Sequence, residues 1–425
     1  MNYPSHGVTD LGIFHPLALG IRKPSQIYLE SHVTNYINAR ENGDPDVQTA
    51  LDNHLNWEQL WSKKSSAIVT SDIIYQKIKE LECRQCGFIS RSQNDLKDHL
   101  NEVHTPSHLN PIHNNIKEFK CQSCEFKSVQ KKDLDMHIKT AHQNKVNKMK
   151  SHAKRVMRER IRSDTSDRTS ELAIQGDFLK LLEAEDQDIT WKAVIYSVPK
   201  GIMAWASRCI TDSLATPSNL AKWKRIIDPT CKLCSQSKGT LHHILNSCSM
   251  MLDRYKWRHD SILNHLAKEL RNSAQCNMKI YADIPNYDIN GGTIPANIIE
   301  TNQRPDLVII DESSNDIEMK IVELTCPFER NYEAAKVRKE DRYAFLLSDI
   351  LSKNINCELY TLEIGSRGHI NNRNKETLRK ILKTTKYKQG NTMLKHLSKL
   401  ALLGSYSIYN ARNDLNWTQV PLICP

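Results

Sequence analysis

Two apolar segments, RPDLVII at residues 304–310 and IVELT at residues 321–325, decide how the C-terminal part of this chain folds. The turn-rich sequence DESSND lies between them, so the pair is typical of two adjacent β-strands. An amphipathic helix is expected over residues 258–270, a long helix over 329–351 and a further strand over 358–364. Helix, strand, strand, helix and strand in this order predict a small α/β or α+β domain.

Each of the two strands carries one carboxylate. Asp306 stands at the start of the first strand and Glu323 stands near the end of the second. Two acids on neighbouring strands can share a Mg²⁺ or Mn²⁺ ion, which stabilises charge and lowers the pKa of the attacking water in phosphodiester hydrolysis. The alternative is that both acids merely lie at strand ends near solvent. The proline before Asp306 and the apolar strands favour the metal site.

A metal nuclease of this type usually has a lysine two residues after the second acid, where this chain has Thr325. The helix that follows could supply the missing lysine, because four of its residues recur at helical spacing on one face. These residues are Tyr332, Lys336, Lys339 and Tyr343. Arg342 lies beside them. A basic stripe is also an ordinary solvated helix face, which is the alternative interpretation.

Two modules between residues 81 and 142 combine cysteines with histidines. Each has two cysteines separated by two residues, then twelve residues, then two histidines separated by four. The ligand candidates are Cys83, Cys86, His99 and His104 in the first module and Cys121, Cys124, His137 and His142 in the second. This spacing suits tetrahedral zinc, and so small a module folds only with its metal. We therefore expect two ββα zinc fingers.

The fingers do not carry the usual side chains for reading guanine. The helix positions that would face bases include acids and no arginine, and sixteen residues separate His104 from Cys121. Binding to DNA, to RNA or to protein therefore stays open for the pair.

A third cluster has the order cysteine, cysteine, histidine, cysteine. Its ligand candidates are Cys231, Cys234, His243 and Cys248, with His242 as a rival ligand. Four such ligands suit a zinc knuckle, and two unrelated cysteine pairs are the alternative. Together with the fingers, the knuckle predicts about three zinc ions per chain.

The net charge of +10 favours polyanionic partners. A basic stretch of high helix propensity runs over residues 145–162, with Lys154, Arg155 and Arg158 as candidate nucleic-acid contacts. We expect DNA as the partner, with the RNA of a genetic element as a second candidate. The sequence begins with no secretory signal and contains no membrane helix, so we expect an intracellular protein that acts in the nucleus without a membrane partner.

Taken together, the knuckle at residues 231–248 followed by Asp306, Glu323 and KEDRY at residues 339–343 resembles part of a known protein class. It is similar to the C-terminal part of proteins from site-specific non-LTR retrotransposons that carry a restriction-like endonuclease. The segment TDSLATPSNL at residues 211–220 resembles the linker of that family, and the resemblance covers roughly residues 170–425.

The resemblance implies a nuclease of the PD-(D/E)xK type whose lysine has moved to the following helix. Asp306 and Glu323 would be metal ligands, Lys339 the catalytic lysine and Tyr343 its neighbour in the active site. Arg342 stands where the family tends to have a second lysine, and arginine is better suited to clamping phosphate than to giving up a proton. The chain has no adjacent Asp-Asp pair, so we expect no reverse transcriptase activity.

These observations predict a multidomain protein. The expected parts are a helical N-terminal region (1–80), two zinc fingers (81–142), a basic and helical linker (143–230), a zinc knuckle (231–248) and a restriction-like α/β endonuclease domain (255–425). The function expected is metal-dependent DNA nicking by a zinc-containing, nucleic-acid-binding protein. The alternatives are a binding-only protein with an inactive nuclease scaffold and an adaptor whose fingers bind protein. The pattern of residues does not specify an oligomeric state.

Overall fold

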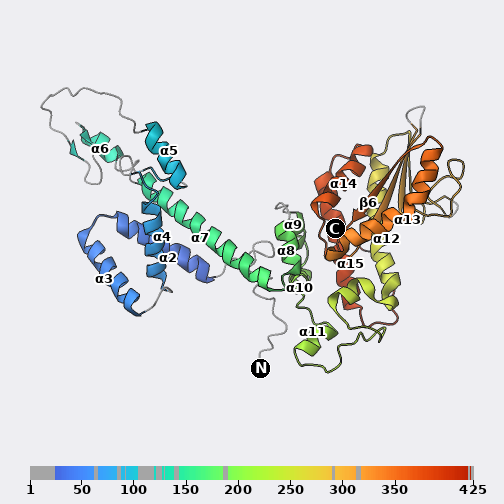
Figure 1. Cartoon of the computed structure of the whole chain (residues 1–425), viewed down its shortest axis with the longest axis horizontal. Helices are drawn as coiled ribbons and strands as arrows, with labels where there is room; N and C mark the ends of the chain where they lie inside the picture. Colours follow the sequence, from blue (N-terminus) through green and yellow to red (C-terminus); the bar gives the residue numbers. More distant parts are fainter. Residues whose placement is uncertain are drawn as a thin grey trace. The chain divides into compact units, whose positions relative to one another are not determined.

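The computed structural model describes most of the chain. The described residues are 24–61, 66–83, 88–90, 92–103, 119–120, 127–128, 130–137, 143–184, 190–289, 292–312, 317–419 and 422. They form two compact units that divide between Arg168 and Thr169 (Figure 1). Within these ranges, no helix is both long enough and apolar enough to cross a bilayer.

Helices build the core of the N-terminal unit. They are α2 (Pro24–Glu41), α3 (Pro45–Trp61), α4 (Ala67–Lys79) and α7 (Gln143–Glu171). On α7, Met149, Ala153 and Met157 recur every four residues and share one buried face. This face packs in the same core as Ile37 of α2 and Ile78 of α4. Burying one such side chain contributes about 1.5–3 kcal/mol, so this core joins helices that are far apart in sequence.

The helix expected over residues 145–162 is confirmed, and it extends to Glu171. Lys154 and Arg158 are exposed on it, away from the buried methionines. Arg155 is partly covered, and its guanidinium contacts His152 and Glu159 on the same helix.

An ion-pair cluster ties three of these helices together. The Tyr75 hydroxyl on α4 donates to Glu41 Oε1 on α2 at 2.8 Å, and Lys79 Nζ lies 2.9 Å from the same oxygen. Lys145 of α7 bridges Glu41 Oε2 at 3.2 Å and Glu82 Oε1 at 2.6 Å. The cluster lies where α4 leads into the first predicted finger.

The finger regions are described only in part. In the first, Glu82 and Ile89 form an antiparallel bridge before α5 (Gln93–Val103), and the ring of Phe88 stacks on His99 at 4.2 Å. In the second, β1 (Phe119–Lys120) pairs with β2 (Lys127–Ser128) ahead of α6 (Lys131–His137). The other predicted finger ligands lie outside the described residues, namely Cys86, His104, Cys121, Cys124 and His142. Both zinc fingers therefore stay predictions.

The C-terminal unit begins with helices that the sequence placed in a linker. These helices are α8 (Asp177–Ala184), α9 (Thr190–Tyr196), α10 (Lys200–Ile210) and α11 (Pro217–Lys222). Pro199 stands just before α10, at its N-cap position. The division between the units falls inside the linker expected over residues 143–230, because α7 packs on the N-terminal core while α8 to α10 share a core with the end of the chain.

A four-stranded sheet forms the centre of the C-terminal unit. Its strands are β3 (Met278–Ala282), β4 (Leu307–Asp311), β5 (Glu318–Thr325) and β6 (Asn356–Glu363), in spatial order β3-β4-β5-β6. The first three strands are antiparallel, and β6 runs parallel to β5. The strands expected from RPDLVII, IVELT and residues 358–364 are confirmed, whereas β3 was not expected.

Helices cover both faces of this sheet (Figure 1). They are α12 (Leu252–Ser273), α13 (Tyr332–Ser352), α14 (Asn372–Thr384) and α15 (Gly390–Asn410). Leu307 and Ile309 of β4 share a core with α12, α14 and α15, whereas the alternate residues Val308 and Ile310 pack on α13. Both faces are buried, which explains the continuous apolar run of this strand.

A buried arginine, Arg367, joins helix α8 to the segment that follows strand β5. The guanidinium of Arg367 lies 4.3 Å from the ring centre of Phe178 on α8 and 4.1 Å from that of Phe328. It also forms an ion pair with Glu329 at 2.7 Å, and the Trp191 indole donates to the Arg367 carbonyl at 3.1 Å. Linker, knuckle and sheet are thus parts of one folded unit.

Candidate active site and zinc site

The pairing of β4 with β5 brings Asp306 and Glu323 together. Leu307 pairs with Val322 in the antiparallel register, so the two acids lie side by side just beyond this pair. The Asp306 amide donates to Glu323 Oε1 at 2.9 Å, and the Leu324 amide donates to Asp306 Oδ2 at 2.8 Å. These backbone bonds fix the orientation of both carboxylates.

Lys339 reaches this pair from α13. Its Nζ atom donates to Glu323 Oε2 and lies 3.4 Å from Asp306 Oδ2. The Glu323 side chain is fully buried, while those of Asp306 and Lys339 are 14% exposed. The Lys339 Nζ atom therefore contacts both acids. It comes from helix α13, whereas Thr325 lies on strand β5.

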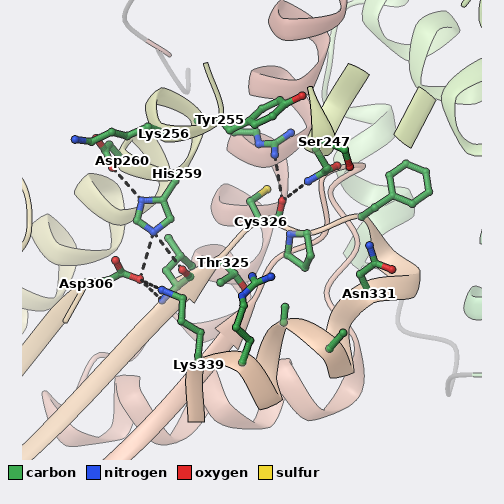
Figure 2. A pocket seen from close by; sticks show the side chains of 18 of the residues that line it. Ser247, Tyr255, Lys256, His259, Asp260, Asp306, Thr325, Cys326, Asn331 and Lys339 are labelled. Atoms are coloured by element: carbon green, nitrogen blue, oxygen red, sulfur yellow. Dashed lines mark hydrogen bonds and ion pairs between the residues drawn. The ribbon is translucent and has the colours of Figure 1, made fainter. Parts of the chain in front are cut away.

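His259 of α12 contacts the same carboxylate from the other side (Figure 2). Its Nε2 atom lies 3.4 Å from Asp306 Oδ2 and 3.2 Å from the Leu324 carbonyl oxygen. Its Nδ1 atom lies 2.9 Å from Asp260 Oδ1. The imidazole is thereby held between two acids.

The environment of the site shifts the pKa values of its titratable groups in different directions. Burial and the charge of Asp306 raise the pKa of Glu323 to about 7. Burial would raise the pKa of Asp306 too, but the hydrogen bond and charge of His259 and the charge of Lys339 lower it to about 2. Burial opposes charge on His259, and the bonds to Asp260 and Asp306 outweigh it and raise its pKa to about 9. Paired carboxylates in such a setting attract cations.

The donor set fits a hard divalent cation. Carboxylate and carbonyl oxygens are the ligands that Mg²⁺ and Mn²⁺ prefer. The Lys339 ammonium contacts both carboxylates, so the two carboxylates face a common point. His259 Nε2 contacts both Asp306 Oδ2 and the Leu324 carbonyl oxygen, so these two oxygen atoms lie near each other. Asp306, Glu323 and the Leu324 carbonyl could therefore hold such an ion.

A cavity of about 720 Å³ opens beside Asp306 and Lys339. Lys256 of α12 and Arg338 of α13 line it, and both side chains are exposed. Within the described ranges, neither of them has an ion pair with an acid. His242, Asn246 and Ser247 of the predicted knuckle also line this cavity.

The other residues predicted on α13 lie apart from the two acids or contact them less directly. The Tyr343 hydroxyl is buried and donates to the Arg304 carbonyl at 3.1 Å, and burial and the Glu323 charge raise its pKa. Arg342 is exposed, with its guanidinium 5.3 Å from the Tyr343 ring centre, and does not line the cavity. Lys336 forms surface ion pairs within its own helix, and the Tyr332 hydroxyl donates to the His369 carbonyl.

The four residues of the predicted knuckle converge. The ligand atoms of Cys231, Cys234, His243 and Cys248 all lie within 4.8 Å of one another. Cys231 Sγ lies 4.0 Å from Cys248 Sγ, and Cys234 Sγ lies 3.4 Å from His243 Nε2. Zn–S bonds of about 2.3 Å in a tetrahedral site separate two sulfur atoms by about 3.8 Å, so the cluster fits zinc.

The structure separates the two neighbouring histidines. His243 faces the cysteines, whereas His242 Nε2 lies 3.3 Å from both Ser247 Oγ and Asn331 Nδ2. A π-helical turn, His243–Ser247, carries the histidine ligand. The Tyr255 hydroxyl of α12 supports this turn, because it donates to the carbonyl oxygens of His243 and Ile244.

Comparison with known proteins bears on this segment. A family model described as zinc-binding in reverse transcriptase matches residues 178–254, which include all four converging ligands. No curated protein matches the chain. The match and the cluster give this segment a zinc-binding domain of reverse-transcriptase-related proteins, which indicates a protein related to retrotransposons. The prediction of a zinc-binding segment related to retrotransposon proteins is therefore confirmed.

Four site residues were not predicted from the sequence: Leu324, through its carbonyl oxygen, and Lys256, His259 and Arg338. Arg338 stands next to Lys339 in the sequence, but helical spacing does not show which basic residues of a helix line a cavity. Apolar periodicity predicted which face of α12 is buried. It could not show that His259 meets the end of β5, because that contact depends on how the helix packs on the sheet.

Proposed function

We propose that this chain is a retroelement-related protein whose C-terminal unit is a metal-dependent DNA endonuclease. The observation that carries the proposal is the convergence of Asp306, Glu323 and Lys339 from three separate elements beside a cavity. A purely structural ion pair would not need the free cations Lys256 and Arg338 at the same cavity. DNA, with its phosphate backbone, is the substrate whose charge matches them.

In this proposal, each residue has a defined task. Asp306, Glu323 and the Leu324 carbonyl would hold one Mg²⁺ or Mn²⁺ ion, which would polarise the scissile phosphate and lower the pKa of the attacking water. Lys339 donates to the phosphate oxygen on which charge develops. His259 orients Asp306.

Further residues would hold the DNA. Lys256 and Arg338 bind phosphates next to the scissile one. Arg342, and the basic face of α7 with Lys154, Arg155 and Arg158, add contacts along the nucleic acid.

The test is nicking of supercoiled plasmid by the full chain with Mg²⁺ or Mn²⁺. Asp306→Asn and Glu323→Gln should each lower the nicking rate by at least about 10²-fold, since each removes a negative metal ligand. DNA binding should persist in both variants. Asp349→Asn, an exposed acid on α13, is the matched control and should nick at the rate of the unchanged protein.

The binding-only alternative predicts DNA binding without nicking. If the unchanged protein binds DNA and never nicks it with either ion, the nuclease proposal is wrong and the C-terminal unit serves as a binding scaffold.

A further inference from the structure

The zinc-binding segment forms one wall of the cavity beside the two acids. Asn246 and Ser247 line that cavity together with Asp306 and Lys339. Asn246 lies in the chain between two of the converging ligands, His243 and Cys248. His243 and Cys248 would hold both ends of the short turn that carries Asn246 in place when zinc is bound.

Asn246 connects this turn to the end of β5. Its Nδ2 atom donates to the Cys326 carbonyl oxygen at 2.7 Å. Cys326 lies two residues beyond Leu324 and three beyond Glu323, so the bond holds the chain just where the catalytic strand ends. Figure 2 shows two dashed lines that meet at the Cys326 carbonyl. The second comes from Arg258, whose Nη2 atom lies 3.1 Å away.

His242 makes a parallel connection to the start of α13, the helix that carries Lys339. Its Nε2 atom lies 3.3 Å from Asn331 Nδ2, and its ring meets the Phe328 ring edge-on at 5.1 Å. The zinc-binding turn thus touches the segment from Cys326 to Asn331, which joins the strand of Glu323 to the helix of Lys339. The relative position of acid and lysine depends on that segment.

We infer that the zinc knuckle is a structural part of the catalytic cavity, and that Asn246 is a positioning residue through which bound zinc orients the end of β5. This inference rests on the proposed nuclease function. A knuckle that served only to grip nucleic acid would need no bond to the Cys326 carbonyl. Partners that orient a ligand commonly affect metal affinity or activity by about 10–100-fold.

The experiment uses the full chain with Asn246→Ala and with Asn246→Asp, which keeps the size of the side chain and removes the donor. Both variants should lower kcat for nicking about tenfold, leave KM for DNA unchanged and retain the zinc content of the unchanged protein. Asn264→Ala, an exposed asparagine on α12, is the matched control and should change none of these quantities.

Two measurements test the coupling without nicking. Amide hydrogen exchange over residues 324–328 should be faster in Asn246→Ala and after removal of zinc by a chelator. The affinity for Mn²⁺ at the paired acids, followed by the paramagnetic resonance of the ion, should fall about tenfold in both cases.

The outcomes separate this inference from the nuclease proposal. Unchanged kcat, exchange and Mn²⁺ affinity in Asn246→Ala with zinc retained would overturn the inference and leave the nuclease intact. Loss of zinc from this variant would overturn it too, because Asn246 would then serve the zinc site itself. If the unchanged protein does not nick, the nuclease proposal fails, and faster exchange with weaker Mn²⁺ binding would still establish the coupling.

Discussion

Lys339 supplies to the paired acids Asp306 and Glu323 the positive charge that Thr325 cannot supply. Threonine at position 325 cannot supply a cation, and the Lys339 side chain reaches both acids from α13 instead. The chemistry depends on where the ammonium lies and not on which element carries it. Spacing along one strand is therefore a poor guide to this site.

The first prediction concerns Lys339. Lys339→Met keeps a long apolar side chain but removes the donor near the scissile phosphate, so the nicking rate should fall about 10²–10³-fold while DNA affinity changes little. Lys336→Met is the control, because among the described residues the ion pairs of Lys336 are with Glu333 and Glu340 on its own helix. A dispensable Lys339 with an essential Lys336 would place the catalytic lysine one turn earlier.

The second prediction concerns Lys256 and Arg338, which line the cavity, are exposed and have no ion pair with an acid among the described residues. Lys256→Ala and Arg338→Ala should each weaken DNA binding and lower the salt dependence of log K by about one, since each removes one phosphate contact. A titration of affinity against salt concentration measures this slope. Lys268→Ala on another face of α12 should leave it unchanged, and equal slopes in all three variants would exclude phosphate contacts at the cavity.

At the scale of elements, the ion-pair cluster of the N-terminal unit links stability to pH. Burial would raise the pKa of Glu41, but hydrogen bonds from Lys79 and Tyr75 and the charges of Lys79 and Lys145 lower it. A carboxylate whose folded pKa is lowered stabilises the fold above the ordinary carboxyl pKa of about 4.3. That stability is lost as the pH falls through the lowered value.

The third prediction follows from this sign. Glu41→Gln should destabilise the N-terminal unit by about 1–2 kcal/mol near pH 7, because the bonds from two lysines and Tyr75 are weakened. The difference from the unchanged protein should shrink below pH 4. Amide exchange of α4 across this pH range measures it. A difference that does not vary with pH would show that the Glu41 charge is not responsible.

The helices and strands of the C-terminal unit differ in how well the sequence predicts them. Strands β4 and β5 are apolar runs bounded by turns, and α13 is long and periodic, so all three were predicted. Strand β3 was missed because MKIYA at residues 278–282 is short and mixes a charged residue with apolar ones. The strand forms because it pairs with β4 along its whole length, a contact that no local pattern contains.

The candidate sites show the same limit. Ligand spacing predicted the knuckle, since metal ligands must lie close in sequence when the module is small. The two acids could be paired because adjacent strands fix their register. The contacts of His259 and Asn246 with the end of β5 join residues about 65 and 80 positions apart, and only the packed structure brings them together.

At the scale of the whole molecule, zinc content is the measurable total of three predicted sites. The fourth prediction is that the purified full chain carries about three zinc ions. Cys234→Ser should lower this number by one, because it removes a ligand from the knuckle. Cys121→Ser should also lower it by one and unfold only the second finger. Metal analysis that finds a single ion in the unchanged protein would exclude both fingers.

The buried side chain of Arg367 limits where this protein can be truncated. Its guanidinium lies between Phe178 of α8 and Phe328, which follows β5, and its charge is balanced by Glu329. A truncated protein that began after the knuckle would lack Phe178 and Trp191. The guanidinium of Arg367 would then be exposed to water on one side. A shortened protein that keeps the sheet and its helices therefore needs the segment that starts at Phe178 in order to keep Arg367 buried.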